Sequence, residues 1–219
     1  TPGSETADAT EPEAEPVTED AVLRWSGLLE IKPLALEPDE LSENDLLARF
    51  TAERSGVVTF ADRASDASGR AATVEYGFTS QRLILSGPSQ ESSVFLTSPT
   101  MGRATMGRLE LDLGTGDGLV PGPFGVVAND KVSKLDARER TTLRFAARDG
   151  RVTGELREVI CEGSVVASDA DSTLKSDFLH AYFDIGESGG SKLRRLIARD
   201  TVSLSDGQGN GGTCDALDV

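Results

Sequence analysis

The segment that decides the fold is residues 174–206, LKSDFLHAYFDIGESGGSKLRRLIARDTVSLSD. Residues 179–183 alternate between apolar and other side chains, a period of two that is typical of a β-strand with one buried face. The glycine-rich stretch 186–190 predicts a turn, and the apolar residues within 193–197 predict a second strand after it. A third short strand is expected over 201–204, so the segment predicts a compact unit of antiparallel strands.

The same pattern recurs along the chain. Residues 74–78, 109–113 and 143–147 alternate in the same way, and the successive strand starts are 34 to 38 residues apart. A fixed period in this range indicates stacked units, none of which can bury its apolar face alone. The only helix candidate is 37–49, and the alternation over 48–52 competes with it as a strand. We therefore expect an all-β protein, a stack of antiparallel strands built from repeats of about 35 residues.

Alternation sorts the side chains of these strands onto two faces. The outward face would present Thr73, Glu75, Arg108, Glu110, Asp112, Arg144 and His180. A second set is apolar and shares the inward face, where it would either fill a closed core or line a groove; the pattern alone leaves both open. This candidate site comprises Val74, Tyr76, Phe78, Leu83, Leu85, Val94, Leu96, Leu109, Leu111, Leu113, Leu143, Phe145, Leu179, Ala181 and Phe183.

A known family has a related motif, L-x-S/A-D-x-L-x-x-Y followed by a hairpin and I-x-A-x-G-x-V. Here its positions are filled by Leu174, Ser176, Asp177, Leu179, Tyr182, Ile197, Ala198 and Val202. Residues 71–87 and 106–127 look like further copies, so the likeness covers roughly 70–219. The segment thus resembles the OstA-like repeats of the lipopolysaccharide-transport proteins LptA, LptC and the LptD N-terminal domain. One departure is Asp200, which stands where the family usually has glycine.

The resemblance implies a fold and a task. The fold would be an open β-jelly roll over residues 21–219, with an apolar groove along its inner face. The task would be non-enzymatic: a periplasmic scaffold that shields the acyl chains of lipopolysaccharide between the inner and outer membranes, without a cofactor. Its partners would be that lipid and other modules of the same type, joined by edge-strand pairing. The alternative is a structural or glycan-binding β-solenoid of the cell envelope with a closed core.

Composition narrows the classes of function. The 219 residues carry a formal net charge of −15, which argues against a sequence-independent nucleic-acid binder. Aromatic residues make up 5% and His180 is the single histidine, so we expect no catalytic site and no metal site. The acidic clusters 169–171 and 206–210 are interpreted as turns rather than calcium loops. Cys161 and Cys214 match no metal spacing, and the sequence leaves open whether they pair or serve as small apolar residues.

The two ends of the chain have features of their own. Residues 1–20 hold seven acidic side chains, three prolines and no basic residue, which predicts a disordered acidic linker. Such a linker suggests a tether to a membrane segment upstream of Thr1. The last copy of the pattern stops at Val219 after two inward positions, so we expect a longer parent protein.

Overall fold

The computed structural model describes residues 21–33, 46–53, 56–63, 66–88, 94–148, 151–186 and 191–219. These residues form eighteen strands and no helix, which confirms the all-β prediction. The predicted linker 1–20 lies outside the described residues, and so does most of the helix candidate 37–49. The described end of that candidate belongs to strand Leu46–Ala52, because the alternation over 48–52 lets one side of it pack inward.

The strands are short in the N-terminal two thirds of the chain and long near its end. In chain order they are β1 Ala21–Arg24, β2 Gly27–Pro33, β3 Leu46–Ala52, β4 Val58–Asp62, β5 Ala67–Ala71, β6 Thr73–Gly77, β7 Arg82–Ser86, β8 Val94–Ser98, β9 Gly102–Met106, β10 Arg108–Asp112, β11 Asp117–Val120, β12 Phe124–Val127, β13 Lys134–Ala137, β14 Arg140–Arg148, β15 Arg151–Ser168, β16 Ser172–Ile185, β17 Ser191–Asp206 and β18 Gly211–Asp218.

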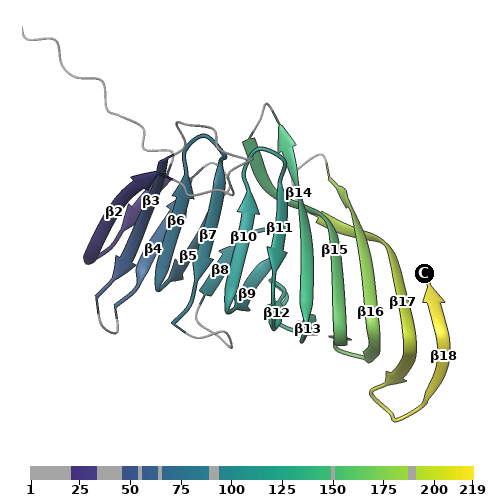
Figure 1. Cartoon of the computed structure of the whole chain (residues 1–219). Helices are drawn as coiled ribbons and strands as arrows, with labels where there is room; N and C mark the ends of the chain where they lie inside the picture. The colour runs from purple at the N-terminus through teal and green to yellow at the C-terminus, as the bar shows by residue number, and fades with distance from the viewer. Residues whose placement is uncertain are drawn as a thin grey trace, which may run out of the picture.

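All strand pairs are antiparallel and link the eighteen strands into one continuous sheet. The pairing forms two ladders, β2-β3-β6-β7-β10-β11-β14 and β1-β4-β5-β8-β9-β12-β13. Strands β15 to β18 continue both ladders, since each of them is long enough to run through one and then the other. We call the ladder with β2 the first layer and the ladder with β1 the second layer; the sheet folds so that they face each other (Figure 1).

The long strands bend where they pass between the layers. Register shifts interrupt the β15–β16, β16–β17 and β17–β18 ladders at this line. Positive φ angles mark it in β15 and β17, at Gly163 (72°), Ser164 (49°), Asp200 (62°) and Thr201 (54°). The sequence predicted a separate third strand at 201–204, and this was wrong. A β-bulge turns the strand without ending it, so this stretch remains part of β17.

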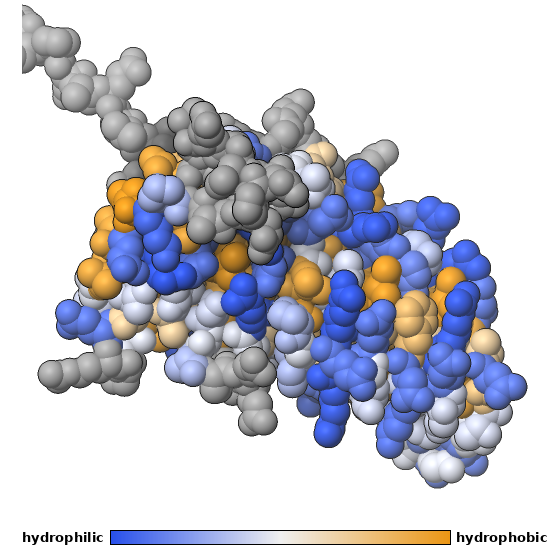
Figure 2. All heavy atoms as spheres, viewed as in Figure 1, coloured by the Kyte–Doolittle hydropathy of each residue, from blue (hydrophilic) through white to orange (hydrophobic). Residues whose placement is uncertain are grey.

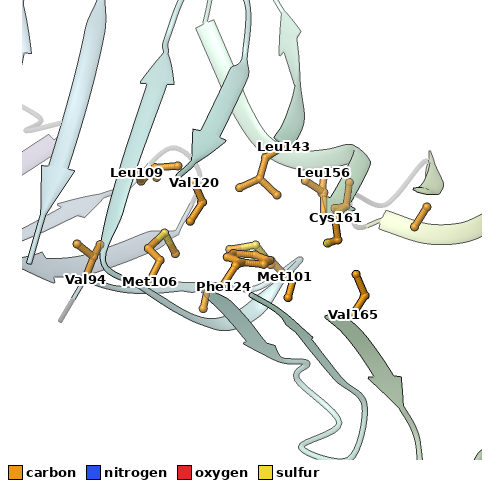
Figure 3. Packing of buried hydrophobic residues seen from close by; sticks show 14 of the residues in the cluster. Val94, Met101, Met106, Leu109, Val120, Phe124, Leu143, Leu156, Cys161 and Val165 are labelled. Carbon is orange, nitrogen blue, oxygen red and sulfur yellow. The ribbon is translucent and has the colours of Figure 1, made fainter. Parts of the chain in front are cut away.

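The hydrophobic core lies between the two layers. In the first layer Val74, Leu85 and Leu109 are direct neighbours across three strands, and each is at most 2% exposed. Figure 3 shows side chains of the first layer, among them Leu109, pointing toward side chains of the second layer such as Met106. Both layers turn their apolar alternate residues inward, as the period of two predicts.

The sheet does not close on itself. Strands β1 and β2 at one end and β18 at the other each have a neighbour on one side only. At the first end, Leu28 and Ile31 of β2 are more than half exposed, and apolar side chains gather on this part of the surface (Figure 2).

Candidate functional site: an apolar cavity between the layers

A cavity of about 830 Å³ separates the two layers in the half of the molecule that contains β15 to β18. Its size falls within the range of about 300–1,000 Å³ that small-molecule sites occupy. Seventeen of its 26 lining residues are apolar, two of them aromatic, and the other nine are polar or charged. The apolar lining residues are Met101, Phe124, Val126, Ala128, Leu135, Leu156, Val159, Ala167, Leu174, Leu179, Ala181, Phe183, Leu193, Leu196, Leu204, Leu217 and Val219.

The cavity is closed at one end and open at the other. At the end near β12 and the start of β15, its lining residues Met101 and Leu156 are 9% and 6% exposed. At the β17–β18 end, the lining residues Leu193, Leu204 and Val219 are 50%, 44% and 68% exposed.

One hydrogen bond joins the layers at the closed end. The Thr100 hydroxyl donates to the carbonyl oxygen of Gly154 over 2.9 Å, linking the β8–β9 turn to the start of β15. The β14–β15 register shifts twice in this region, between the pairs formed by Arg144 and Phe145 and by Phe145 and Ala147. These irregularities bend the start of β15, which brings Gly154 within reach of the other layer.

Side-chain size alone does not place the cavity. Both halves carry large and small inward residues: Leu85 and Ala104 are buried in the closed half, and Leu179 and Ala181 line the cavity. Side chains of the two layers pack against each other in the closed half, whereas the layers of the β15–β18 half leave a volume between them.

Charged groups stand at the rim. Lys134 from the second layer and Lys192 from β17 both line the cavity, and neither has a hydrogen-bond or ion-pair partner among the described residues. The rim carboxylates are engaged locally. Asp130 accepts hydrogen bonds from the Ser133 hydroxyl and from backbone N–H groups, and these lower the pKa of its carboxyl below the usual value. Backbone N–H groups and the Ser172 hydroxyl lower the pKa of Asp169 in the same way.

Thirteen of the fifteen residues predicted to form a groove lie on the inner face by register, whereas Phe78 and Leu113 lie just beyond β6 and β10, outside any paired strand. Only three of the fifteen, Leu179, Ala181 and Phe183, line the cavity. The other twelve lie elsewhere in the molecule. Of those twelve, Val74, Leu85, Val94, Leu109 and Leu143 are buried in the closed half, and Phe78 is exposed. The remaining six, Tyr76, Leu83, Leu96, Leu111, Leu113 and Phe145, are partly buried.

Sequence reasoning left most of the cavity wall out of the candidate site. Leu193 and Leu196 were assigned to a strand and Leu174 to the family motif, but none of them was named as a site residue. Leu156, Leu204 and Leu217 share the same strand periodicity, which is the one signal that could have found them.

His180 lies on the outer face, in the same cross-strand row as Glu75 and Glu110, as predicted. Its Nε2 is hydrogen-bonded to Glu158, and its ring stacks on Tyr182 with centroids 4.1 Å apart. Glu158 also accepts a hydrogen bond of 2.7 Å from Arg144. The network ties β14, β15 and β16 together on the face opposite the cavity, which is a structural role.

The two cysteines are free in the structure. Cys161 is buried on the inner face beside Thr141, whereas Cys214 is exposed on the edge strand β18. Of the two possibilities left open, that of a small buried apolar residue describes Cys161, and neither describes Cys214.

The acidic clusters form turns, as interpreted. Asp169 accepts from the N–H groups of Asp171 and Ser172, and Asp206 accepts from those of Gln208 and Asn210. Across the described ranges, no group of three or more His, Cys, Asp or Glu side chains could hold a metal ion.

Comparisons with protein-family models, curated proteins and solved structures return no match for this chain. In the part of the chain that the structure describes, no helix has the length and hydrophobicity needed to cross a membrane.

Proposed function

We propose that the protein is a non-enzymatic lipid-binding scaffold, an open β-jelly roll of OstA-like repeats that shields the acyl chains of lipopolysaccharide in the periplasm. The observation that carries the proposal is the largely apolar cavity between the layers, to which seventeen apolar side chains contribute. The alternation of first-layer and second-layer hairpins along the chain supports the repeat of about 35 residues.

Exposing the acyl chains of a lipid to water costs a large amount of free energy. Each methylene exposed to water costs about 0.8 kcal/mol, so an acyl chain of a dozen methylenes costs on the order of 10 kcal/mol. An apolar wall removes this cost along the length of the chain. The cavity supplies that wall, whereas the outer face carries ion pairs such as Arg144–Glu158.

The cavity also favours this proposal over a solenoid with a closed core. A closed core would be packed to the density seen around Leu85 and Leu109, with no large volume between the layers. The half that contains Leu85 and Leu109 is packed in this way, whereas the β15–β18 half has a cavity between its layers.

Partner modules would attach at the sheet edges. Strands β1, β2 and β18 present unpaired backbone groups, and such edges accept a further strand from another chain. A module added at β18 would extend the wall beyond Leu217 and Val219, which are at the open end of the cavity.

Photocrosslinking with lipopolysaccharide tests the proposal. A photoreactive amino acid at Leu193 or Leu204 would lie at the cavity mouth, where both side chains are half exposed and tolerate replacement. The matched control is Ile197, which lies on β17 but faces outward in the row of His180. We expect lipid adducts from the first two positions and not from the third. Equal yields at all three, or none at the mouth of the folded protein, would contradict the proposal.

A further inference from the structure

We propose that two copies of this chain pair through strand β2, antiparallel and about a two-fold axis at Ile31, so that their first layers join into one sheet. A two-fold contact of this kind uses the same surface on both copies, so the surface must be complementary to itself. The strand lies at the end of the molecule opposite the cavity, and the inference does not depend on lipid binding.

Strand β2 is an edge that no other described strand covers. All seven of its residues are exposed, and the side chains of Leu28, Leu29 and Ile31 are 57%, 41% and 61% exposed (Figure 2). An edge with exposed apolar side chains is a template for a strand from another chain. Residues 1–20, which precede β1, have no apolar alternation that predicts a further strand of this sheet. We therefore expect the strand that covers β2 to come from another chain.

The pairing of β2 with β3 shows which backbone groups face away from the sheet. The Glu53 N–H donates to the Ser26 carbonyl oxygen, so these two residues form a hydrogen-bonded pair of the ladder. Such pairs alternate along an antiparallel ladder, and the even-numbered residues of β2 are therefore those that bond to β3. The N–H and C=O groups of Leu29 and Ile31 point outward, together with the carbonyl group of Pro33, which has no N–H.

A two-fold axis at Ile31 joins these outward groups and pairs opposite charges. The Ile31 residues of the two copies would exchange N–H···O=C bonds, and the Leu29 N–H of each copy would donate to the Pro33 carbonyl of the other. The same register places Glu30 opposite the second copy's Lys32, and it does so twice. An axis at Glu30 would instead place two carboxylates opposite each other, and an axis at Leu29 would leave both charges without an opposite partner.

Both charges are available for this contact. Lys32 has no hydrogen-bond or ion-pair partner among the described residues. The Glu30 side chain is 44% exposed and lies 3.9 Å from Arg49, which forms a closer ion pair of 2.6 Å with Glu75. Strand β18, at the other end of the first layer, contains acidic residues and no basic one, so it offers Glu30 no partner. Charge complementarity thus favours a second β2 over β18 as the strand that covers this edge.

Sedimentation equilibrium of the full chain over a range of concentrations tests the pairing. We expect a monomer–dimer equilibrium for the unaltered protein. Lys32→Glu and Glu30→Lys should each weaken dimerisation about tenfold, because two attractive cross-strand pairs become repulsive. The double variant, Glu30→Lys with Lys32→Glu, should restore the affinity, since the two charges exchange places across the axis. The matched control is Arg103→Glu, which changes the net charge as Lys32→Glu does, at an exposed position of β9, and should leave dimerisation unchanged.

Three results would overturn the pairing. One is a protein that stays monomeric at every concentration, and another is a dimer that Lys32→Glu weakens no more than Arg103→Glu does. The third is a double variant as weak as the single ones, which would mean that β2 accepts a different strand, such as β18 of another copy. The proposed lipid binding is measured separately by photocrosslinking, and none of these three results bears on it.

Discussion

Thr100 and Gly154, 54 residues apart in the chain, are joined by a hydrogen bond of 2.9 Å that connects the two layers of the sheet. The bond stands between a half of the molecule whose interior is packed and a half whose interior is a cavity. Its position gives the first prediction.

Replacing Thr100 by valine keeps the shape of the side chain and removes the donor. We expect the free energy of unfolding to fall by about 1 kcal/mol, the usual net contribution of one hydrogen bond. Urea denaturation measures the change, and Thr100→Ser, which keeps a hydroxyl, should lose less. Identical stability of the valine and unaltered proteins would mean that the bond does not hold the layers together.

The bend in β17 concerns Asp200, whose φ of 62° is in the left-handed region that favours glycine. Asp200→Gly should raise the free energy of unfolding by up to about 1 kcal/mol, and Asp200→Ala should lower it by a similar amount. Thermal or urea unfolding of the two variants distinguishes strain from loss of the charge. If glycine and alanine have the same effect, the backbone at this position is not strained.

Glu110 lies on the outer face between Arg82 and Arg108 and forms ion pairs with both. Partial burial acts to raise the pKa of its carboxyl, but hydrogen bonds from Arg82 and then Arg108 outweigh this and hold the pKa below the usual value. A carboxyl with a lowered pKa stabilises the fold above its ordinary pKa, and this contribution disappears as the pH falls through the lowered value.

The corresponding variant is Glu110→Gln. At neutral pH it should cost roughly 1 kcal/mol or less, as partly exposed ion pairs do. Unfolding measured from neutral to strongly acidic pH should show the difference from the unaltered protein shrinking on the acid side. If the free energies of unfolding of Glu110→Gln and of the unaltered protein differ by the same amount at every pH, the ion pairs of Glu110 do not stabilise the fold in this way.

The two cysteines should differ sharply in reactivity. Burial raises the pKa of the Cys161 thiol to about 11, with an opposing, smaller effect of the hydrogen bond from Thr141. Since the thiolate is the reactive form, iodoacetamide at neutral pH should modify Cys214 alone in the native protein and both residues after unfolding. Intact-mass measurement counts the adducts. A native protein that takes up two labels, or whose mass reveals a disulfide, would contradict the structure.

The sequence predicted the strands well because their signal is local. Alternation around residues 74–78 and 109–113 placed β6 and β10, and it put His180 on the outer face. The bends escaped prediction, since β15 and β17 continue through bulges at Ser164 and Asp200 that depend on pairing with neighbouring strands.

The cavity could not be located from the same signal. Leu109 and Leu179 have the same alternation and are both almost fully buried, yet one lies in the packed half and the other lines the cavity. The difference lies in whether side chains of the opposite layer pack against each leucine, and those side chains come from strands far away in the chain. Periodicity carries no information about such contacts.

The most direct test of the central claim locates a bound chain inside the protein. Methyl NMR of leucine-labelled protein would follow its signals as tetradecanoate is added. The account predicts shifts at the cavity residues Leu174, Leu196 and Leu217, and none at Leu85 and Leu109 in the packed half. Shifts confined to the packed half or to the outer face, or the absence of any shift at saturating lipid, would contradict it.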